Sequence, residues 1–238
     1  MAGVVEWIAR VGGMDLYTKI NLLILAIPLA LSFDRKVAFW KKGPQVAAAI
    51  LAVVVVFGAW DSWMASRGIW EFNPEHAGTW RFLHLPLGEW LFFICVPYAC
   101  LFVLACVRSY FQDRAWGLKR RMVMIGVFIF FVFAWLFREK GYTWSVFLSA
   151  GLAIMALDVW VPATLRSRNF WVALGLTYVP FVIANGVLTG LPIVLYDNTQ
   201  NLAIRVGSIP AEDFVFSFSM LALAVLIQDV VERRRGLQ

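Results

Sequence analysis

The sequence predicts an all-α integral membrane protein with seven transmembrane helices, and two observations carry this prediction. Hydrophobic residues make up 61% of the 238 residues and charged residues 15%, whereas soluble domains average about 45–50% and about 25%. The apolar residues also gather in seven runs, each close to the length that a membrane-spanning helix requires. A soluble fold of this size cannot bury so much apolar surface, which excludes an ordinary cytosolic enzyme, a disordered chain and a secreted disulfide scaffold.

The seven runs are bounded by charged residues or by glycine and proline. They cover residues 17–33, 44–60, 88–107, 121–137, 144–163, 170–188 and 212–230. Of the 21 lysines and arginines, 14 follow the first, third, fifth and seventh runs. Because cytoplasmic loops carry the excess of basic residues, we expect a multi-pass cell-membrane protein with its N-terminus, which includes Arg10, outside and its C-terminus in the cytoplasm. The net charge of +6 has the same explanation, so we expect no nucleic-acid partner.

The chain contains an internal repeat. A shift of 124 residues aligns Asp34 with Asp158 and Phe92 with Phe216, without a gap between these limits. Polar residues match polar residues where a membrane protein tolerates them least, although chance apolar similarity is the alternative. The shift predicts two parallel three-helix repeats, over 17–112 and 144–238, joined by one linker helix over 121–140. In such folds, sites tend to lie where the two copies face each other.

Polar residues that recur in both copies are the candidates for chemistry. They are Asp61, Arg81 and Glu89 in the first copy, and Asn185, Arg205, Glu212 and Asp213 in the second. The acids follow Pro86 and Pro210, so the simpler interpretation is that they only cap helices. Their recurrence at the ends of otherwise uncharged spans favours a functional role. The candidate substrate-binding residues beside them are Trp63, Trp70, Phe72, Asn73, Phe92, Tyr196 and Phe216.

Other chemistries lack their motifs. The two histidines, His76 and His84, do not have a metal-ligand spacing, and no glycine-rich nucleotide loop is present. The three cysteines, Cys95, Cys100 and Cys106, fit small core residues better than a zinc site or a disulfide framework. We therefore expect neither a metal nor a cofactor.

At these motifs the chain resembles the bacterial and archaeal lycopene cyclases that are built from two small membrane modules. The first module is matched by WD at 60–61, GIWEFNP at 68–74 and LPLGEWLFF at 85–93; the second by NG at 185–186, LTG at 188–190, PIV at 192–194 and IPAED at 209–213. The resemblance spans residues 34–230 and implies a fused two-module enzyme.

One position departs from the family pattern, because the first module usually carries two adjacent acids and here Gly88 precedes Glu89. Either Glu89 suffices, or the pair Glu212–Asp213 performs the proton chemistry, or the activity has diverged. We favour the pair, with Glu212 as general acid and Asp213 as its partner or proton acceptor. In this hypothesis Glu89 is the counterpart of these acids in the first module.

The same hypothesis gives supporting roles to the other candidates. Asp61 and Asn185 orient the acids, Arg81 and Arg205 set their charge, and Trp70 and Tyr196 face a carbocation. The implied reaction is the acid-initiated, non-redox conversion of the linear end group of lycopene to a β-ionone ring. The expected partners are lycopene or a related carotenoid and the lipid bilayer. Whether the chain forms a homo-oligomer is left open. The alternatives are a transporter with parallel repeats and a carotenoid-binding protein without catalysis.

Overall fold

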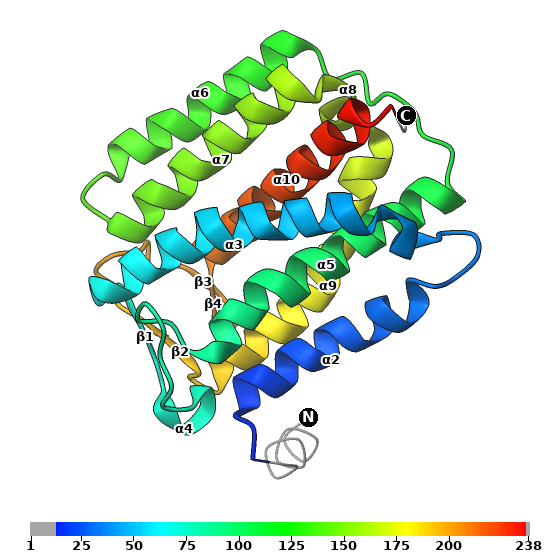
Figure 1. Cartoon of the computed structure of the whole chain (residues 1–238). Helices are drawn as coiled ribbons and strands as arrows, with labels where there is room; N and C mark the ends of the chain where they lie inside the picture. Colours follow the sequence, from blue (N-terminus) through cyan, green and yellow to red (C-terminus); the bar gives the residue numbers. More distant parts are fainter. Residues whose placement is uncertain (1–12, 237–238) are drawn as a thin grey trace.

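The computed structural model describes residues 13–236, and helices dominate it (Figure 1). Arg10, the other residues before 13 and the last two residues of the predicted second repeat lie outside the described residues. Each of the seven predicted runs forms a helix. The long helices are α2 (Leu16–Leu31), α3 (Gly43–Ser66), α5 (Leu87–Tyr110), α6 (Arg120–Leu136), α7 (Gly141–Trp160), α9 (Arg168–Gly190) and α10 (Ala211–Arg234).

Short elements occupy the connections. They are the 3-10 helix η1 (Phe39–Lys42), the helices α4 (Pro74–Ala77) and α8 (Pro162–Arg166), and the strands β1 (Trp70–Phe72), β2 (Val194–Tyr196), β3 (Arg205–Val206) and β4 (Ile209–Pro210). Strands β3 and β4 form a small hairpin directly before α10.

Within residues 13–236, five helices are long and apolar enough to cross a membrane, so the chain is a multi-pass membrane protein. They are α3 together with η1, and α5, α7, α9 and α10. Helices α2 and α6 have 16 and 17 residues, which is short for a bilayer core of about 30 Å at 1.5 Å per residue. Seven crossings therefore stay a prediction.

Local sequence signals begin several of these helices. The side chain of Asp15 accepts a hydrogen bond of 2.8 Å from the backbone N–H of Thr18 at the start of α2. Ser167 caps α9 in the same way, through the N–H of Phe170 at 3.2 Å. Pro86 and Pro210 directly precede α5 and α10. The acids Glu89 and Asp213 thus enter the first turns of their helices, where a negative charge complements the helix dipole.

The two copies meet symmetrically at the strands. Antiparallel β1 and β2 place Glu71 opposite Leu195, and these two residues also correspond under the 124-residue shift. The backbone N–H of Asn73 donates to the carbonyl of Ile193 at 3.0 Å, and the N–H of Asp197 donates to the carbonyl of Ile69 at 2.9 Å. These two bonds exchange under the same shift. The strand pair therefore lies on a pseudo-two-fold axis between the copies.

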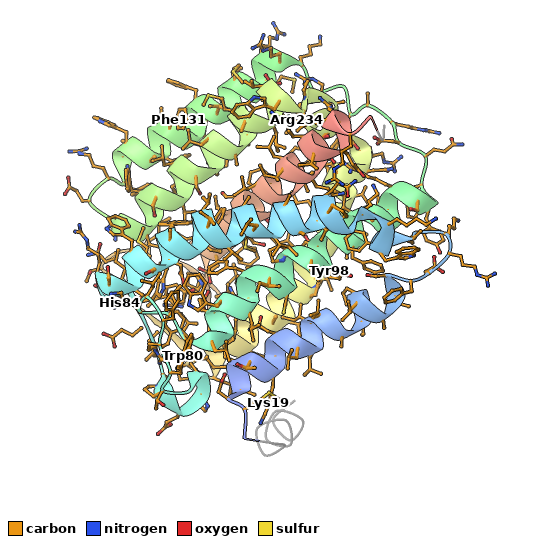
Figure 2. All side chains as sticks on the ribbon, viewed as in Figure 1. Lys19, Trp80, His84, Tyr98, Phe131 and Arg234 are labelled. Carbon is orange, nitrogen blue, oxygen red and sulfur yellow. The ribbon has the colours of Figure 1, made fainter. Side chains whose placement is uncertain are left out.

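The helices pack with the same symmetry: the middle helix of each copy packs against the third helix of the other copy. Helix α3 packs against α10, and α9 packs against α5 (Figure 1). Helix α6 lies at the edge of the bundle and packs mainly against α7. There Phe131, labelled in Figure 2, approaches Gly151. A Cβ on this glycine would lie 2.6 Å from the ring.

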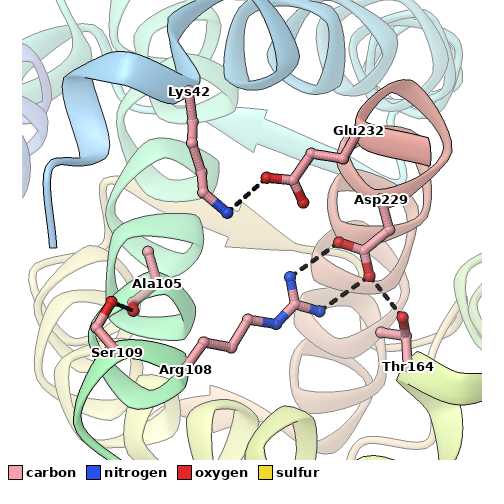
Figure 3. A network of polar contacts seen from close by, with 7 residues as sticks. All are labelled: Lys42, Ala105, Arg108, Ser109, Thr164, Asp229 and Glu232. Atoms are coloured by element: carbon pink, nitrogen blue, oxygen red, sulfur yellow. Dashed lines mark hydrogen bonds and ion pairs between the residues drawn. The ribbon is translucent and has the colours of Figure 1, made fainter. Parts of the chain in front are cut away.

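Paired charges tie the helices together at the end of the bundle opposite the strands (Figure 3). Arg108 of α5 donates two hydrogen bonds of 2.9 Å to Asp229 of α10, and Thr164 of α8 donates a third of 2.5 Å. Lys42 forms an ion pair of 2.5 Å with Glu232. The pairing compensates the buried carboxylates and fixes how α5, α8 and α10 meet. The candidate site lies at the other end of the bundle, beside the strands. Figure 2 labels Trp80 and His84 at the strand end and Arg234 at the end with the paired charges.

Candidate active site

A cavity of about 50 Å³ lies where the strand loops meet the ends of α3, α5, α9 and α10. Both copies contribute to it. Its lining residues are Tyr17, Asp61, Trp70, Phe72, Glu89, Phe92, Tyr142, Phe181, Asn185, Leu188, Val194, Tyr196, Asp213 and Phe216. The carboxyl groups of Asp61, Glu89 and Asp213 are all buried, so three acids share one aromatic chamber.

Asp213 is the most fully hydrogen-bonded of the three acids. Tyr142 donates its hydroxyl to Oδ1 at 2.5 Å. Asn185 donates its amide to Oδ2 at 2.7 Å, and the hydroxyl of Tyr196 donates to the same oxygen at 3.1 Å. Because hydrogen bonds to a carboxylate are strongest when it is ionised, this environment suits a negatively charged Asp213.

The acids of the first copy receive fewer hydrogen bonds. Tyr17 donates its hydroxyl to Oε2 of Glu89 at 2.6 Å. Oδ2 of Asp61 is buried and has no hydrogen-bond partner among the described residues. A buried carboxyl oxygen without a hydrogen-bond partner favours the neutral form of the acid.

Aromatic rings surround the acids. The ring of Trp70 lies edge-on to that of Tyr142 at 5.1 Å between centroids, and Tyr142 stacks on Tyr196 at 5.8 Å. Burial raises the pKa of Tyr196 well above its ordinary value, and the charge of Asp213 adds to this shift. Tyr196 therefore keeps its proton at neutral pH and acts as a hydrogen-bond donor. The guanidinium of Arg205 also lies over the Tyr196 ring, 5.8 Å from its centroid.

The structure brings most of the sequence-predicted residues together. The cavity is lined by Asp61, Glu89, Asn185 and Asp213 among the polar candidates and by Trp70, Phe72, Phe92, Tyr196 and Phe216 among the aromatic ones. Five candidates lie elsewhere: Trp63, Asn73, Arg81, Arg205 and Glu212.

Glu212 is buried beside the cavity and holds a loop. Its Oε1 accepts hydrogen bonds of 2.7 Å from the hydroxyl of Thr143 and from the backbone N–H of Leu202. Oε2 is buried without a hydrogen-bond partner among the described residues. These contacts join α7, the loop before β3 and α10, which is a structural task. The sequence-based assignment of Glu212 as general acid stays untested. Of these two adjacent acids, Asp213 is the one that lines the cavity.

The two predicted arginines also bind loop backbone. Arg81 donates to the carbonyls of Gly78 at 2.7 Å and Phe72 at 3.2 Å. Arg205 donates to the carbonyl of Ser208 at 2.7 Å and to Oδ1 of Asn198 at 2.8 Å. Within residues 13–236, neither arginine forms an ion pair with a cavity acid.

The remaining two candidates lie in the last turn of α3 and in the loop that follows it. Trp63 is exposed, and the guanidinium of Arg67 lies 5.1 Å from its ring centroid. Asn73 caps the short helix α4 by accepting a hydrogen bond of 3.0 Å from the N–H of Glu75. Both residues therefore have local structural contacts instead of a place in the cavity lining.

Sequence reasoning missed the two tyrosines that bind the acids. Tyr17-Thr18 and Tyr142-Thr143 are the same dipeptide, at the start of the first helix of each copy. They are separated by 125 residues, one more than the repeat shift, so an ungapped comparison beginning at Asp34 does not align them. The recurring Tyr-Thr dipeptide is the signal in the sequence, and an alignment of the two copies that allows one gap would find it.

Tyr17 also explains Gly88. A Cβ at this position would lie 2.5 Å from Cγ of Tyr17, so a larger residue would displace the ring that binds Glu89. The side chain of Asn21 donates to the carbonyl of Gly88 at 2.8 Å. In the first copy the space beside the acid is thus filled by a tyrosine ring instead of a second carboxylate.

The fold and the cavity define a class: multi-pass membrane proteins with a duplicated helical unit that buries acid–tyrosine pairs between its copies. The family model described as lycopene cyclase matches residues 14–107 and 139–231, once in each copy. The chain therefore belongs to the lycopene cyclase family. Comparisons with curated proteins and with solved structures found no significant match. Family membership supports an enzyme of carotenoid cyclisation that acts in the membrane.

Proposed function

We propose that this protein converts the linear end group of lycopene, or of a related carotenoid, to a β-ionone ring, as an intramolecular lyase or isomerase. One observation carries the proposal: three buried carboxyl groups share an aromatic cavity between the two copies. The substrate dissolves only in the membrane, and five of the described helices are long and apolar enough to span one.

The reaction needs one proton given and one proton taken. Protonation of C2 of the end group makes a tertiary cation at C1, and the neighbouring double bond closes the ring by forming the C1–C6 bond. Loss of a proton from C6 then creates the ring double bond. No electrons are gained or lost overall, so a carboxylic acid and a carboxylate suffice. Aromatic faces stabilise the cation, and a dry cavity protects it from water.

We assign the proton donor to the first copy and the acceptor to the second. Glu89 accepts one hydrogen bond, from Tyr17, and Oδ2 of Asp61 accepts none, which suits acids that carry the proton. Asp213 accepts three, which suits a base. This assignment moves the acid role from Glu212 to Glu89 with Asp61, and it keeps Asp213 as acceptor and Asn185 as the residue that orients it.

The arrangement in the membrane is part of the proposal. Helices α2, α3 and α5 form the first three-helix unit, α6 is the linker, and α7, α9 and α10 form the second unit, as predicted for 17–112, 121–140 and 144–238. From the distribution of the basic residues we infer that the strand end lies outside the cell and the C-terminus in the cytoplasm. The chemistry requires no cofactor, and the oligomeric state stays open.

Solvent deuterium tests the function directly. The purified protein in liposomes is supplied with lycopene in D₂O, and the pigments are separated and weighed by mass spectrometry. A carboxylic acid exchanges its proton with solvent, so each ring formed should carry one deuterium at C2. A cyclised product without deuterium would contradict acid initiation. Bound but unchanged lycopene would identify a carotenoid-binding protein, and net release of an internal solute would identify a transporter.

A further inference from the structure

An apolar groove runs beside the acid cavity, between α2, α5 and α9. Its volume is about 300 Å³. Leu23 and Ile27 of α2 form part of its rim and are 54% and 69% exposed. Its inner wall includes Ala99 of α5 and Ala184 of α9. In a bilayer this rim faces lipid, so the groove opens to the phase in which a carotenoid dissolves.

The groove adjoins the acid cavity. Phe92, Phe181 and Asn185 line both. Asn185 also donates to Asp213 at 2.7 Å, so the inner end of the groove lies one side chain from a reacting acid. The acid cavity has a volume of about 50 Å³ and the groove one of about 300 Å³, so the groove is the one with more room for a chain.

The equivalent place in the other half of the molecule is filled. The 124-residue shift puts Trp60 where Ala184 stands. The Trp60 ring lies 5.5 Å from Phe57 and 5.1 Å from Phe216 between centroids, and these two rings are the counterparts of Phe181 and Phe92. Three aromatic rings thus pack together on one side, whereas an alanine leaves space on the other.

The backbone differs between the two sides as well. Each helix of the groove has a proline within it, Pro28 in α2, Pro97 in α5 and Pro180 in α9. The counterpart helices α3, α7 and α10 have none beyond the first turn. A proline removes a backbone hydrogen bond and disturbs regular packing, so the opening lies among the three helices that are interrupted.

We propose that this groove binds the polyene chain of a linear carotenoid and delivers its end group to the acid cavity, so that substrate enters from the α2–α9 side alone. The inference rests on the proposed function and adds to it the path of the substrate. Ala184 is the residue that keeps this side open, and Trp60 closes the other.

The test installs the closed-side residue in the groove. Ala184→Trp is compared with Ile183→Trp, which changes the neighbouring residue on α9, 61% exposed and outside the groove. Binding of lycopene is measured by its absorption in purified protein carrying Asp213→Asn, which separates binding from cyclisation. Turnover is measured without that substitution. Because each excluded carbon of the chain loses burial, we expect Ala184→Trp to lower both by at least about tenfold, and Ile183→Trp to leave both unchanged.

A second variant guards against misfolding. Ala99→Leu installs the counterpart residue Leu223 with a smaller added volume, and we expect a smaller loss of binding with an unchanged melting temperature. If Ala184→Trp and Ala99→Leu both retained wild-type binding and turnover, the groove would not be the substrate site, but the proposed cyclase function would still stand. Binding that Ala184→Trp abolishes, in a protein that never cyclises lycopene, would support the groove and refute the proposed function. Copurified acyl lipid that lycopene does not displace would also overturn the groove.

Discussion

The two halves of the molecule place an acid at the same point of the same helix and then surround it differently. Asp213 accepts hydrogen bonds from three side chains, whereas Glu89 accepts one, from Tyr17. The residue before the acid is Glu212 in the second half and Gly88 in the first. Cyclisation is itself asymmetric, because one proton is given and another taken. The difference indicates how a duplicated unit acquires two unlike acids without a change of fold.

The sharpest way to break the comparison is to remove each acid in turn. If Glu89 donates and Asp213 accepts, Glu89→Gln and Asp213→Asn should each lower ring formation by about a hundredfold or more. The measurement is the pigment content of lycopene-producing cells, with protein level checked by immunoblot. Glu71→Gln is the control, because Glu71 is an exposed acid in β1. Wild-type activity in Glu89→Gln would assign all proton chemistry to the second half.

Removing the tyrosine hydroxyls should rank the two halves. Tyr17→Phe deprives Glu89 of its one described hydrogen-bond donor, whereas Tyr142→Phe leaves Asp213 with Asn185 and Tyr196. Glu89 becomes a carboxylate as it gives up its proton, and a hydrogen bond to a charged group contributes about 1.5–3 kcal/mol. We therefore expect Tyr17→Phe to slow turnover by about tenfold or more, and Tyr142→Phe to slow it less because Asp213 keeps two donors. Initial rates in liposomes provide the comparison, and the reverse order would contradict the assigned roles.

Gly88→Ala tests why the first half lacks a second acid. The added Cβ would overlap the ring of Tyr17, with 2.5 Å to Cγ. Overpacking of this kind costs about 1–3 kcal/mol, so the melting temperature in detergent should fall. Gly175→Ala is the control, because nothing lies within 4 Å of a Cβ there. Equal melting temperatures for the two variants would mean that Tyr17 can move aside.

Glu212→Gln should have the smallest effect, since the amide retains an oxygen to accept from Thr143 and Leu202. We expect ring formation within about threefold of wild type and a loss of stability near the low end of the 0.5–1.5 kcal/mol typical of one hydrogen bond. Pigment analysis and thermal unfolding measure the two quantities. A loss as large as that of Asp213→Asn would restore Glu212 as the general acid.

Much of the site could be predicted from the sequence, because membrane spans and recurring polar residues can be recognised from the order of residues along the chain. Apolar runs of this length must form helices in lipid, and the shift of 124 residues paired Asp61 with Asn185 and Glu89 with Asp213. The same pattern marked Trp70, Tyr196, Phe92 and Phe216 as neighbours of the acids. All of them line the cavity, since residues at matching positions of a symmetric dimer-like fold meet near its axis.

Only the tertiary structure could decide which of two adjacent acids faces the cavity. Consecutive residues on a helix point about 100° apart, so Asp213 reaches the chamber while Glu212 turns toward Thr143 and the loop at Leu202. In the sequence, Arg81 and Arg205 look like partners of the acids, yet their guanidinium groups donate hydrogen bonds to loop carbonyls instead. The tyrosines and the open groove arise from contacts between helices far apart in the chain, which no spacing along the sequence records.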